Sequence, residues 1–320
     1  MKTSVIIRAY NEAEHIGRLL TGLSRQTLPP EEVILVDSGS TDSTVDIATR
    51  FGARIVTITP EEFTFGRSLN LGCGAATGDV LLIASAHVYP LYDTWVEAML
   101  QPFEDPAVAL TYGRQVGDHR TRFSEQQLLA RWFPTRSNPR QGHPFCNNAN
   151  AAIRRDLWLT MPYDEEITGL EDMHWAKRAM GAGHHIAYVA EAPVAHVHRE
   201  TFSQLKNRYR REAIAHASVF PEQRLSRVDA VRIATVNIMN DYLHATLQGK
   251  LLPNLLDIPR FRIAQFAGSY QGFQQRGPVA KALLHHFYYP NGFKASRENP
   301  DSPTIGEPIQ YEELSERHAA

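Results

Sequence analysis

Short apolar runs alternate with helical patterns in the first part of the chain, and this alternation constrains the fold more than any other feature. The apolar runs predict strands at residues 4–7, 32–36, 54–58 and 80–84. The stretches between them predict helices at residues 12–23, 44–51 and 68–76, because their apolar residues recur at the spacing of one helix face. Strands joined through helices run parallel. The sequence therefore predicts an α/β fold with a mainly parallel sheet, whose ligand crevice lies beyond the carboxyl ends of the strands.

Composition and charge narrow the class of protein. The 320 residues include 33 Lys and Arg against 35 Asp and Glu, a formal net charge of −2. A nearly neutral chain has no global basic field, so we expect no nucleic-acid partner. The two cysteines, Cys73 and Cys146, favour a reduced, cytoplasmic protein without a disulfide framework. We expect neither a signal peptide nor a spanning helix, because every apolar run is too short.

Polar side chains follow three of the predicted strands, at residues 8–12, 37–42 and 85–87. Asp37, at a strand end, can accept a hydrogen bond from N3–H of uracil or thymine, and Tyr10 offers a ring for stacking. This combination favours a pyrimidine nucleotide. Ser40 and Asp42 have a second interpretation, as caps of the helix that follows them. Both can hold at once, since a helix N-terminus also suits a diphosphate.

The order of these motifs resembles family 2 glycosyltransferases with the GT-A fold. Residues 36–42, Val-Asp-Ser-Gly-Ser-Thr-Asp, resemble the V-D-D-G-S-T-D signature of that family, and Arg-Ala-Tyr-Asn-Glu at 8–12 is similar to its first-strand motif. Gly-Arg-Ser-Leu-Asn at 66–70, Thr-Gly-Asp at 77–79 and the Glu-Asp pair at 171–172 resemble later segments. The resemblance covers about residues 3–215.

The resemblance implies a domain organisation. We expect a GT-A domain over residues 1–215, with a nucleotide-sugar half to about 105 and an acceptor half from about 106. A helical extension with an acidic, loosely held tail follows over residues 216–320. Val228, Val231, Ile238 and Tyr242 fall on one helix face of this extension, which predicts that the face packs against another element.

The resemblance also implies which residues contact the nucleotide sugar. Arg67 is expected to neutralise part of the diphosphate charge, since a charge pair at about 4 Å is worth about 4 kcal/mol at an effective dielectric near 20. The implied donor-binding residues are Arg8, Tyr10, Glu12, Asp37, Ser38, Arg67, Asn70, Ser85 and Ala86. Asn147 and Asn148 resemble an acceptor-side loop, where asparagines bond sugar hydroxyls or simply form turns.

The largest departure from the family is at residues 85–87, where Ser-Ala-His replaces Asp-x-Asp. In the family the second aspartate binds a divalent metal, and His87 takes its place. Imidazole suits Mn²⁺ or another softer ion better than Mg²⁺. His196 and His198 fall on the same face of an extended chain and could complete the metal site. With fourteen histidines in the chain, a structural role for all three is the alternative.

Transfer with inversion needs a base that deprotonates the acceptor hydroxyl. The resemblance assigns this role to Asp172, with Glu171 orienting the base or touching the acceptor. The alternative is that both carboxylates only complement the dipole of the helix that they open.

These residues together predict an inverting glycosyltransferase that moves one sugar from a UDP- or dTDP-sugar to a hydroxyl of a glycan or lipid-linked glycan. Processive synthases of the family carry a Gln-x-x-Arg-Trp segment, which this chain lacks. A catalytically inactive nucleotide-binding scaffold is the alternative. A sugar nucleotidyltransferase ranks last, because residues 8–12 contain no glycine for a triphosphate loop.

A short basic stretch and a group of aromatic residues are weaker indications of contact with a membrane or with a second copy of the chain. The basic stretch 206–211 predicts a solvated helix face or, alternatively, attraction to an anionic lipid surface. Phe287, Tyr288 and Tyr289 could add an interfacial aromatic contact. We therefore expect a cytoplasmic protein, with peripheral attachment at the inner face of the membrane and a homodimer as further possibilities.

Overall fold

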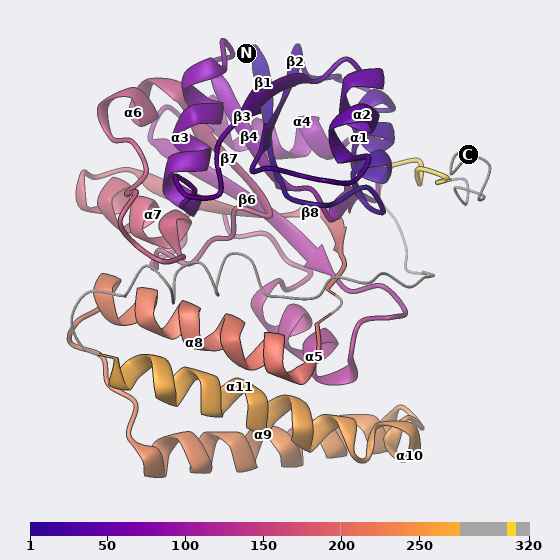
Figure 1. The fold of residues 1–320 in the computed structure, drawn as a ribbon, viewed down its shortest axis with the longest axis vertical. Helices are drawn as coiled ribbons and strands as arrows, with labels where there is room; N and C mark the ends of the chain where they lie inside the picture. The colour runs from indigo at the N-terminus through magenta and orange to yellow at the C-terminus, as the bar shows by residue number, and fades with distance from the viewer. Residues whose placement is uncertain (199, 276–305, 312–320) are drawn as a thin grey trace.

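The computed structural model describes residues 1–198, 200–275 and 306–311. An α/β body occupies one end of the molecule and a layer of long helices the other (Figure 1). Eight strands form one sheet, in the order β3-β2-β1-β4-β7-β6-β8-β5. Their bounds are β1 Thr3–Ala9, β2 Glu32–Asp37, β3 Arg54–Thr57, β4 Val80–Ser85, β5 Val88–Pro90, β6 Val108–Val116, β7 Asn150–Arg154 and β8 His185–His196.

The sheet is mixed rather than uniform. The strands β3, β2, β1 and β4 are parallel neighbours, as the predicted βαβ units require. The strand β7 pairs antiparallel with both β4 and β6, β8 pairs parallel with β6, and β5 pairs antiparallel with β8. The predicted parallel half is therefore confirmed, and the second half adds antiparallel pairs on both sides of β7 and at the edge strand β5.

Helices cover both faces of the sheet. Their bounds are α1 Ile16–Ser24, α2 Thr44–Arg50, α3 Phe65–Ala75, α4 Trp95–Leu100, α5 Phe123–Trp132, α6 Arg155–Thr160, α7 Glu171–Gly181, α8 Phe202–Val219, α9 Arg227–Leu247, α10 Leu251–Asn254 and α11 Asp257–Gln274, with a 3₁₀ turn at Gln101–Glu104. One apolar core joins α1, α2 and α4 to the sheet, and a second joins α3, α6 and α7 to the other face. Both cores contain side chains with no exposed surface.

Two predicted helix starts are wrong by three or four residues. The helix α1 begins at Ile16 rather than at residue 12, because the backbone turns after Asn11, whose φ is 54°. The helix α3 begins at Phe65 rather than at residue 68, because the Thr64 hydroxyl accepts a hydrogen bond from the backbone N–H of Arg67 and caps the helix.

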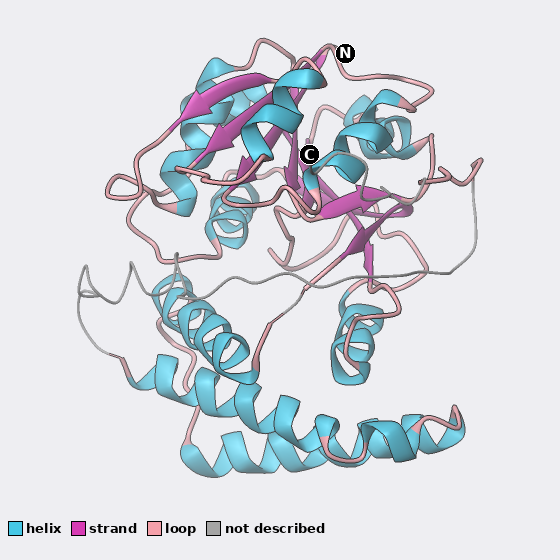
Figure 2. Cartoon of the chain, turned by 45° about the vertical axis from the view of Figure 1, so that its right-hand side comes forward, coloured by secondary structure: helices cyan, strands magenta, loops and turns pink. Residues whose placement is uncertain are grey.

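The C-terminal helices form a layer below the sheet (Figure 2). The helix α11 lies against α8 at close range: a Cβ at Gly268 would stand 2.2 Å from the Lys206 carbonyl oxygen, so the helices approach this closely only with glycine there. The buried Arg262 on α11 pairs with Asp241 on α9 at 2.8 Å. The predicted boundary at residue 215 falls inside α8, which belongs to both the layer and the body.

The prediction that one face of the extension is packed is wrong for its first turns. Val228 is 76% exposed and Val231 is 61% exposed on α9. Ile238 and Tyr242, further along the helix, do pack against a small apolar core. Ala230, which lies between these two valines, is buried, so the first turns of α9 are covered on a different side from the one that carries Val228 and Val231. Within the described residues, no helix combines the length and the apolarity that a membrane span requires.

The described part of the tail is held more firmly than predicted. Pro308 forms a bridge with Tyr92, and the Tyr311 ring lies 4.9 Å from that of Tyr89, edge to face. Phe287, Tyr288 and Tyr289 lie outside the described residues. Cys73 and Cys146 are free, buried thiols, and burial raises the pKa of each.

Candidate active site

A cavity of about 380 Å³ lies where the strands β1, β2 and β4 end, below the sheet and beside α8. Twelve of the sequence-predicted site residues line it. They are Arg8, Tyr10, Glu12, Ser38, Ser85, His87, Asn147, Asn148, Glu171, Asp172, His196 and His198. Residues far apart in the chain, from the strand ends and from the later segments, therefore meet in one place.

Four predicted residues do not line this cavity. Asp37 is buried beneath it, where its carboxylate accepts hydrogen bonds from the backbone N–H groups of Gly39 and Ser40 at 3.1 Å. Its side chain shapes the turn after β2, at which Gly39 takes a φ of 92°. Ala86 is buried in the apolar core.

The other two residues sit on α3 and face away from the cavity. The Arg67 side chain is 44% exposed and lies 3.3 Å from the Glu62 carboxylate. Asn70 accepts a hydrogen bond from the Trp158 indole at 3.0 Å and donates one to the Tyr163 carbonyl at 2.9 Å. Arg67 therefore lies on the outer side of α3, while the hydrogen bond from Trp158 to Asn70 joins α6 to α3.

The loop after β1 is fixed by the signature segment. Ser40 Oγ accepts a hydrogen bond from the backbone N–H of Asn11 at 2.9 Å. Asp42 accepts one from Ala13 N–H and one from Thr44 N–H, both at 3.0 Å. The bond to Thr44 agrees with the capping interpretation of Asp42. Ser40 and Asp42 thus hold the loop that carries Tyr10 and Glu12.

Glu171 and Asp172, which we call the carboxylate pair, open α7 inside the cavity. Leu170, just before them, takes a left-handed conformation with φ 55°, which is costly for a side chain of this size. One Asp172 oxygen accepts a hydrogen bond from Asn148 N–H at 2.8 Å, and Glu171 forms an ion pair with Arg8 at 3.0 Å. The strained turn places two carboxylates side by side.

The surroundings of the carboxylate pair favour the neutral form of one member. Burial and then the Glu171 charge raise the pKa of Asp172 to about 7. Hydrogen bonds from Asn148 and Met173 and the Arg8 charge oppose this rise but do not cancel it. A carboxylate with this pKa takes up a proton readily at neutral pH, which is what a general base must do.

His87, His196 and His198, which we call the histidine cluster, occupy another wall of the cavity. The rings of His196 and His198 lie 4.1 Å apart, and that of His87 lies 5.2 Å from His196. The prediction that the His196 and His198 side chains lie on the same face of the extended chain is confirmed. Each ring offers one ligand nitrogen, and these atoms lie within 4.8 Å of one another. Nε2 of His196 is buried without a hydrogen-bond partner.

These three residues fit a divalent transition metal, since neutral imidazole is its usual ligand. Burial, with the neighbouring histidines and Arg208, holds the pKa of His196 well below its usual value, which keeps this ring neutral. Burial alone would lower the pKa of His87, but the Glu12 charge and its hydrogen bond outweigh that effect and raise it.

Helix α8 contributes residues that the sequence analysis did not place in the site. Asn207, Arg208 and Arg211 line the cavity, so the prediction of a solvated face for the basic stretch is wrong. Arg208 lies 3.0 Å from Glu125 on α5 and 2.8 Å from Glu200. The His198 and Arg208 charges overcome the effect of burial and lower the pKa of Glu125 to about 2. The only sequence signal for this role is that Arg208 and Arg211 are three residues apart, a spacing that places both on one helix face.

Phe65 sits between two cationic side chains at the edge of the cavity. The guanidinium carbons of Arg8 and Arg211 each lie 4.8 Å from the centroid of its ring. Both are closer to the predicted donor residues than Arg67 is, because they line the same cavity. The cationic groups beside Phe65 in this cavity thus come from β1 and α8.

The two asparagines that were predicted to contact the acceptor differ in their contacts. Asn147 Oδ1 accepts a hydrogen bond from Ala149 N–H at 2.9 Å, as a turn residue does. Asn148 contacts the carboxylate pair through its backbone and side chain, while its own Oδ1 is buried without a hydrogen-bond partner. An unused buried acceptor in a cavity wall suits a hydroxyl donor.

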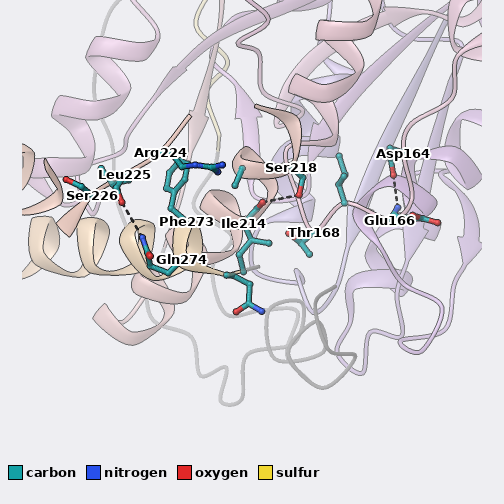
Figure 3. Close-up of a pocket in the computed structure, with 13 residues that line it drawn as sticks. Asp164, Glu166, Thr168, Ile214, Ser218, Arg224, Leu225, Ser226, Phe273 and Gln274 are labelled. Atoms are coloured by element: carbon teal, nitrogen blue, oxygen red, sulfur yellow. Dashed lines mark hydrogen bonds between the residues drawn. The ribbon is translucent and has the colours of Figure 1, made fainter. Parts of the chain in front are cut away.

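A second cavity, of about 550 Å³, lies between the loop before α7 and the helices α8 and α11 (Figure 3). Arg224, Phe273 and Gln274 line one side of it, and Asp164 and Glu166 line the other. None of the predicted site residues is among those that line it. Although it is larger, the chemistry-bearing side chains gather in the first cavity, which we take as the site.

Comparison with known proteins agrees with the resemblance read from the motifs. A model of glycosyl transferase family 2 matches residues 4–159. The O-antigen chain rhamnosyltransferase WbaN of Salmonella anatum is 32% identical over 204 residues, which cover 60% of this chain and 65% of that protein. The rhamnosyltransferase RfbN of Salmonella typhimurium is 28% identical over 229 residues, covering 68% and 73%. The chain thus spans just under two thirds of the first relative.

Solved structures share the fold at lower identity. A mannosyltransferase of Pyrobaculum calidifontis, in complex with GDP-Man and Mn²⁺, superposes with a TM-score of 0.61 at 17% identity, covering 85% of this chain and 86% of that one. A glucosyl-3-phosphoglycerate synthase of Mycobacterium tuberculosis, in complex with Mg²⁺ and UDP, gives 0.52 at 21%, covering 68% and 79%.

The sheet order and the cavity at its carboxyl edge define a GT-A fold, with a helical layer appended. The chain matches the model of glycosyl transferase family 2 over residues 4–159, and its relatives WbaN and RfbN are rhamnosyltransferases.

Proposed function

We propose that this protein transfers a single sugar, with inversion, from a UDP- or dTDP-sugar to a hydroxyl of a glycan or lipid-linked glycan. The observation that carries the proposal is the position of Asp172, a buried carboxylate of raised pKa in the same cavity as the strand-end residues. Because the relatives are rhamnosyltransferases, a rhamnosyl donor is the first to test.

The donor nucleotide occupies the end of the cavity formed by Tyr10 and Ser38. Tyr10 offers a ring for the base, and the turn held by Asp37 supports Ser38 beside it. The diphosphate lies toward Arg8 and Arg211, whose charges favour an anion. A divalent ion at His87, completed by His196 and His198, would neutralise further negative charge on the diphosphate, with Mn²⁺ favoured over Mg²⁺.

The chemical step is a displacement at the anomeric carbon of the donor. The acceptor oxygen forms the new bond to that carbon, the bond to the diphosphate oxygen breaks, and the nucleoside diphosphate leaves with the electron pair. Asp172 takes the proton from the acceptor hydroxyl. Asn148 Oδ1 accepts a hydrogen bond from an acceptor hydroxyl, and Glu171, held by Arg8, keeps Asp172 basic.

The test is a transfer assay with UDP- and dTDP-sugars, a panel of glycan acceptors and the variant Asp172→Asn. General-base catalysis contributes about 10²–10⁴-fold, so Asp172→Asn should lower kcat by that factor while nucleotide binding persists. The matched control is Asp156→Asn, which changes an exposed carboxylate on α6. A fully active Asp172→Asn protein would refute the assignment of the base.

The alternative of an inactive scaffold makes a separate prediction. It requires nucleotide binding by the unmodified protein with no turnover for any acceptor. Turnover with one sugar donor would refute the scaffold. Binding without turnover over the whole panel would refute the transferase proposal.

Attachment to a membrane and formation of a homodimer stay predictions. The basic stretch that suggested a lipid surface faces the cavity instead. The exposed apolar side chains of α9, among them Val228, Met239 and Leu247, provide a surface on which either contact could form.

A further inference from the structure

The second cavity, of about 550 Å³, lies next to the first and shares two of its walls. One shared wall is the loop before α7, in which residues 166–168 line the second cavity and residues 169–172 line the first. The other is α8, which lines the first cavity up to Glu212 and the second from Ile214 onwards. The two cavities therefore lie end to end between the same loop and the same helix.

The boundary between the two cavities is short. Thr168 lines the second cavity, and the next residue, Gly169, lines the first. On α8, Glu212 and Ile214 are two positions apart, which is about 3 Å along a helix axis. At this boundary the Thr168 hydroxyl donates a hydrogen bond to the Arg211 carbonyl at 3.4 Å. A single side-chain contact, rather than an intervening element, thus separates the second cavity from the carboxylate pair.

The side chains of the second cavity have the chemistry of a carbohydrate site. Phe273 offers an aromatic ring on the same side as Arg224 and Gln274 (Figure 3). Glu166 lies on the opposite side. Carboxylate, amide and guanidinium groups each present two polar atoms in one plane, which suits neighbouring hydroxyls of a sugar. An aromatic ring packs against the apolar face of a sugar ring.

Other classes of ligand fit the second cavity less well. A phosphate or a lipid diphosphate would meet two carboxylates, Asp164 and Glu166, against one cation, Arg224. The alkyl chain of a lipid needs a continuous apolar wall, but eight of the 13 lining residues have polar side chains. The volume of about 550 Å³ lies within the range of about 300–1,000 Å³ that is usual for sites of small ligands. A neutral ligand rich in hydroxyl groups therefore matches the cavity best.

We propose that the second cavity binds the distal sugar units of an oligosaccharide acceptor, meaning those beyond the unit whose reacting hydroxyl lies at Asp172. The inference rests on the proposed function, since it concerns the acceptor of that transfer. It names the acceptor class as a neutral oligosaccharide rather than a monosaccharide. The helices α8 and α11 thus extend the acceptor side beyond the α/β body.

Sugar binding to the full chain, measured by calorimetry without a donor, tests the proposal. The probes are neutral trisaccharides of glucose, galactose, mannose and rhamnose, each with its methyl monosaccharide. At least one trisaccharide should bind about tenfold or more tightly than its monosaccharide, which corresponds to about 1.4 kcal/mol. A smaller ratio for every sugar, or no saturable binding of any trisaccharide, would overturn the proposal.

Substitutions in the lining locate the binding. Gln274→Ala removes an exposed amide from the second cavity, and loss of one hydrogen bond should weaken trisaccharide binding about 2–10-fold. Phe273→Ala should weaken it at least as much, because the ring supplies contact area. Gln271→Ala, which changes an exposed glutamine of α11 that does not line the cavity, is the matched control and should leave the affinity unchanged. Equal trisaccharide affinity in Gln274→Ala and the unmodified protein would contradict the proposed site.

The outcomes separate the distal site from the proposed function. Trisaccharide binding that depends on Gln274, with no turnover for any donor, would support the distal site and refute the transferase. Turnover with the same KM for a trisaccharide acceptor and its monosaccharide would support the transferase and refute the distal site. Distal contacts contribute equally to the substrate and the transition state, so Gln274→Ala should raise the KM for a trisaccharide acceptor about 2–10-fold, with kcat changed less than about twofold.

Discussion

The histidine cluster and the carboxylate pair share one cavity, yet the side chains around them differ and suit them to different chemistry. Every ring of the cluster has an oxygen acceptor behind it, which leaves nitrogen lone pairs toward the cavity. The carboxylate pair has two carboxyl groups side by side, and one cation, Arg8, contacts Glu171 directly. One wall is arranged to attract positive charge, and the other is arranged to take up a proton.

The difference shows how the fold assigns roles to titratable groups. Identity of the residue type is not enough, since Glu125 and Asp172 are both buried carboxylates. The charges of His198 and Arg208 lower the pKa of Glu125 to about 2, whereas burial and Glu171 raise that of Asp172 to about 7. The neighbouring charges, which come from different elements, thus keep Glu125 ionised and make Asp172 a base.

Among the substitutions considered, replacing Arg8 should have the largest effect on the carboxylate pair. Arg8→Met leaves both members of the carboxylate pair without their cation, and breaking a buried ion pair costs about 3–5 kcal/mol. The Arg8 charge also lowers the pKa of Asp172, so its loss should move the acidic limb of the activity profile to higher pH. Chemical denaturation and a pH profile of kcat measure the two effects.

Arg50→Met, which removes an exposed arginine on α2, is the control for Arg8→Met. It should change neither the denaturation midpoint nor the pH profile. An Arg8→Met protein with normal stability and an unshifted profile would show that Arg8 does not support the carboxylate pair.

Glu171→Gln should shift the same profile in the opposite direction. In the unmodified protein activity should fall as the pH drops through about 7, because Asp172 becomes protonated and can no longer act as base. Removal of the Glu171 charge lowers the pKa of Asp172, so the acidic limb should move down by on the order of one pH unit. The measurement is kcat against pH for both proteins.

A shift of the Glu171→Gln profile to higher pH would contradict the proposed coupling. The Mn²⁺ affinity of this variant should stay unchanged, because Glu171 belongs to the carboxylate pair and not to the histidine cluster.

The sequence predicted the half of the sheet that holds the predicted donor residues. This was possible because βαβ units form from neighbouring segments, whose apolar residues recur with the period of a strand or a helix. It also predicted twelve residues that line the cavity, since motifs at strand ends converge wherever parallel strands end together. It could not predict Glu125 or Gln115, which reach the histidines from α5 and β6. Their neighbours in the chain carry no motif, and contacts between distant elements arise only when the whole fold forms.

The same limit explains the misplaced residues. Arg67 stands in a segment that resembles the family, and its charge suggested a diphosphate contact. In the structure Arg67 lies in the first turn of α3, and its side chain is on the surface beside Glu62. The motif gives the residue type and its place in the chain, but not the side of the helix on which the side chain lies.

The smallest expected effect therefore belongs to Arg67→Ala. The side chain is 44% exposed, and its pair with Glu62 is a surface ion pair, worth about 0–1 kcal/mol. Because it lies outside the cavity, the KM for the sugar nucleotide should change less than about threefold, which corresponds to under about 1 kcal/mol. Arg211→Ala is the informative partner, since Arg211 lines the cavity beside Phe65 and should raise that KM clearly more. If Arg67→Ala raised the KM as much as Arg211→Ala, the diphosphate would extend beyond the cavity toward α3, and the cationic contact would have to be assigned to the outer side of that helix.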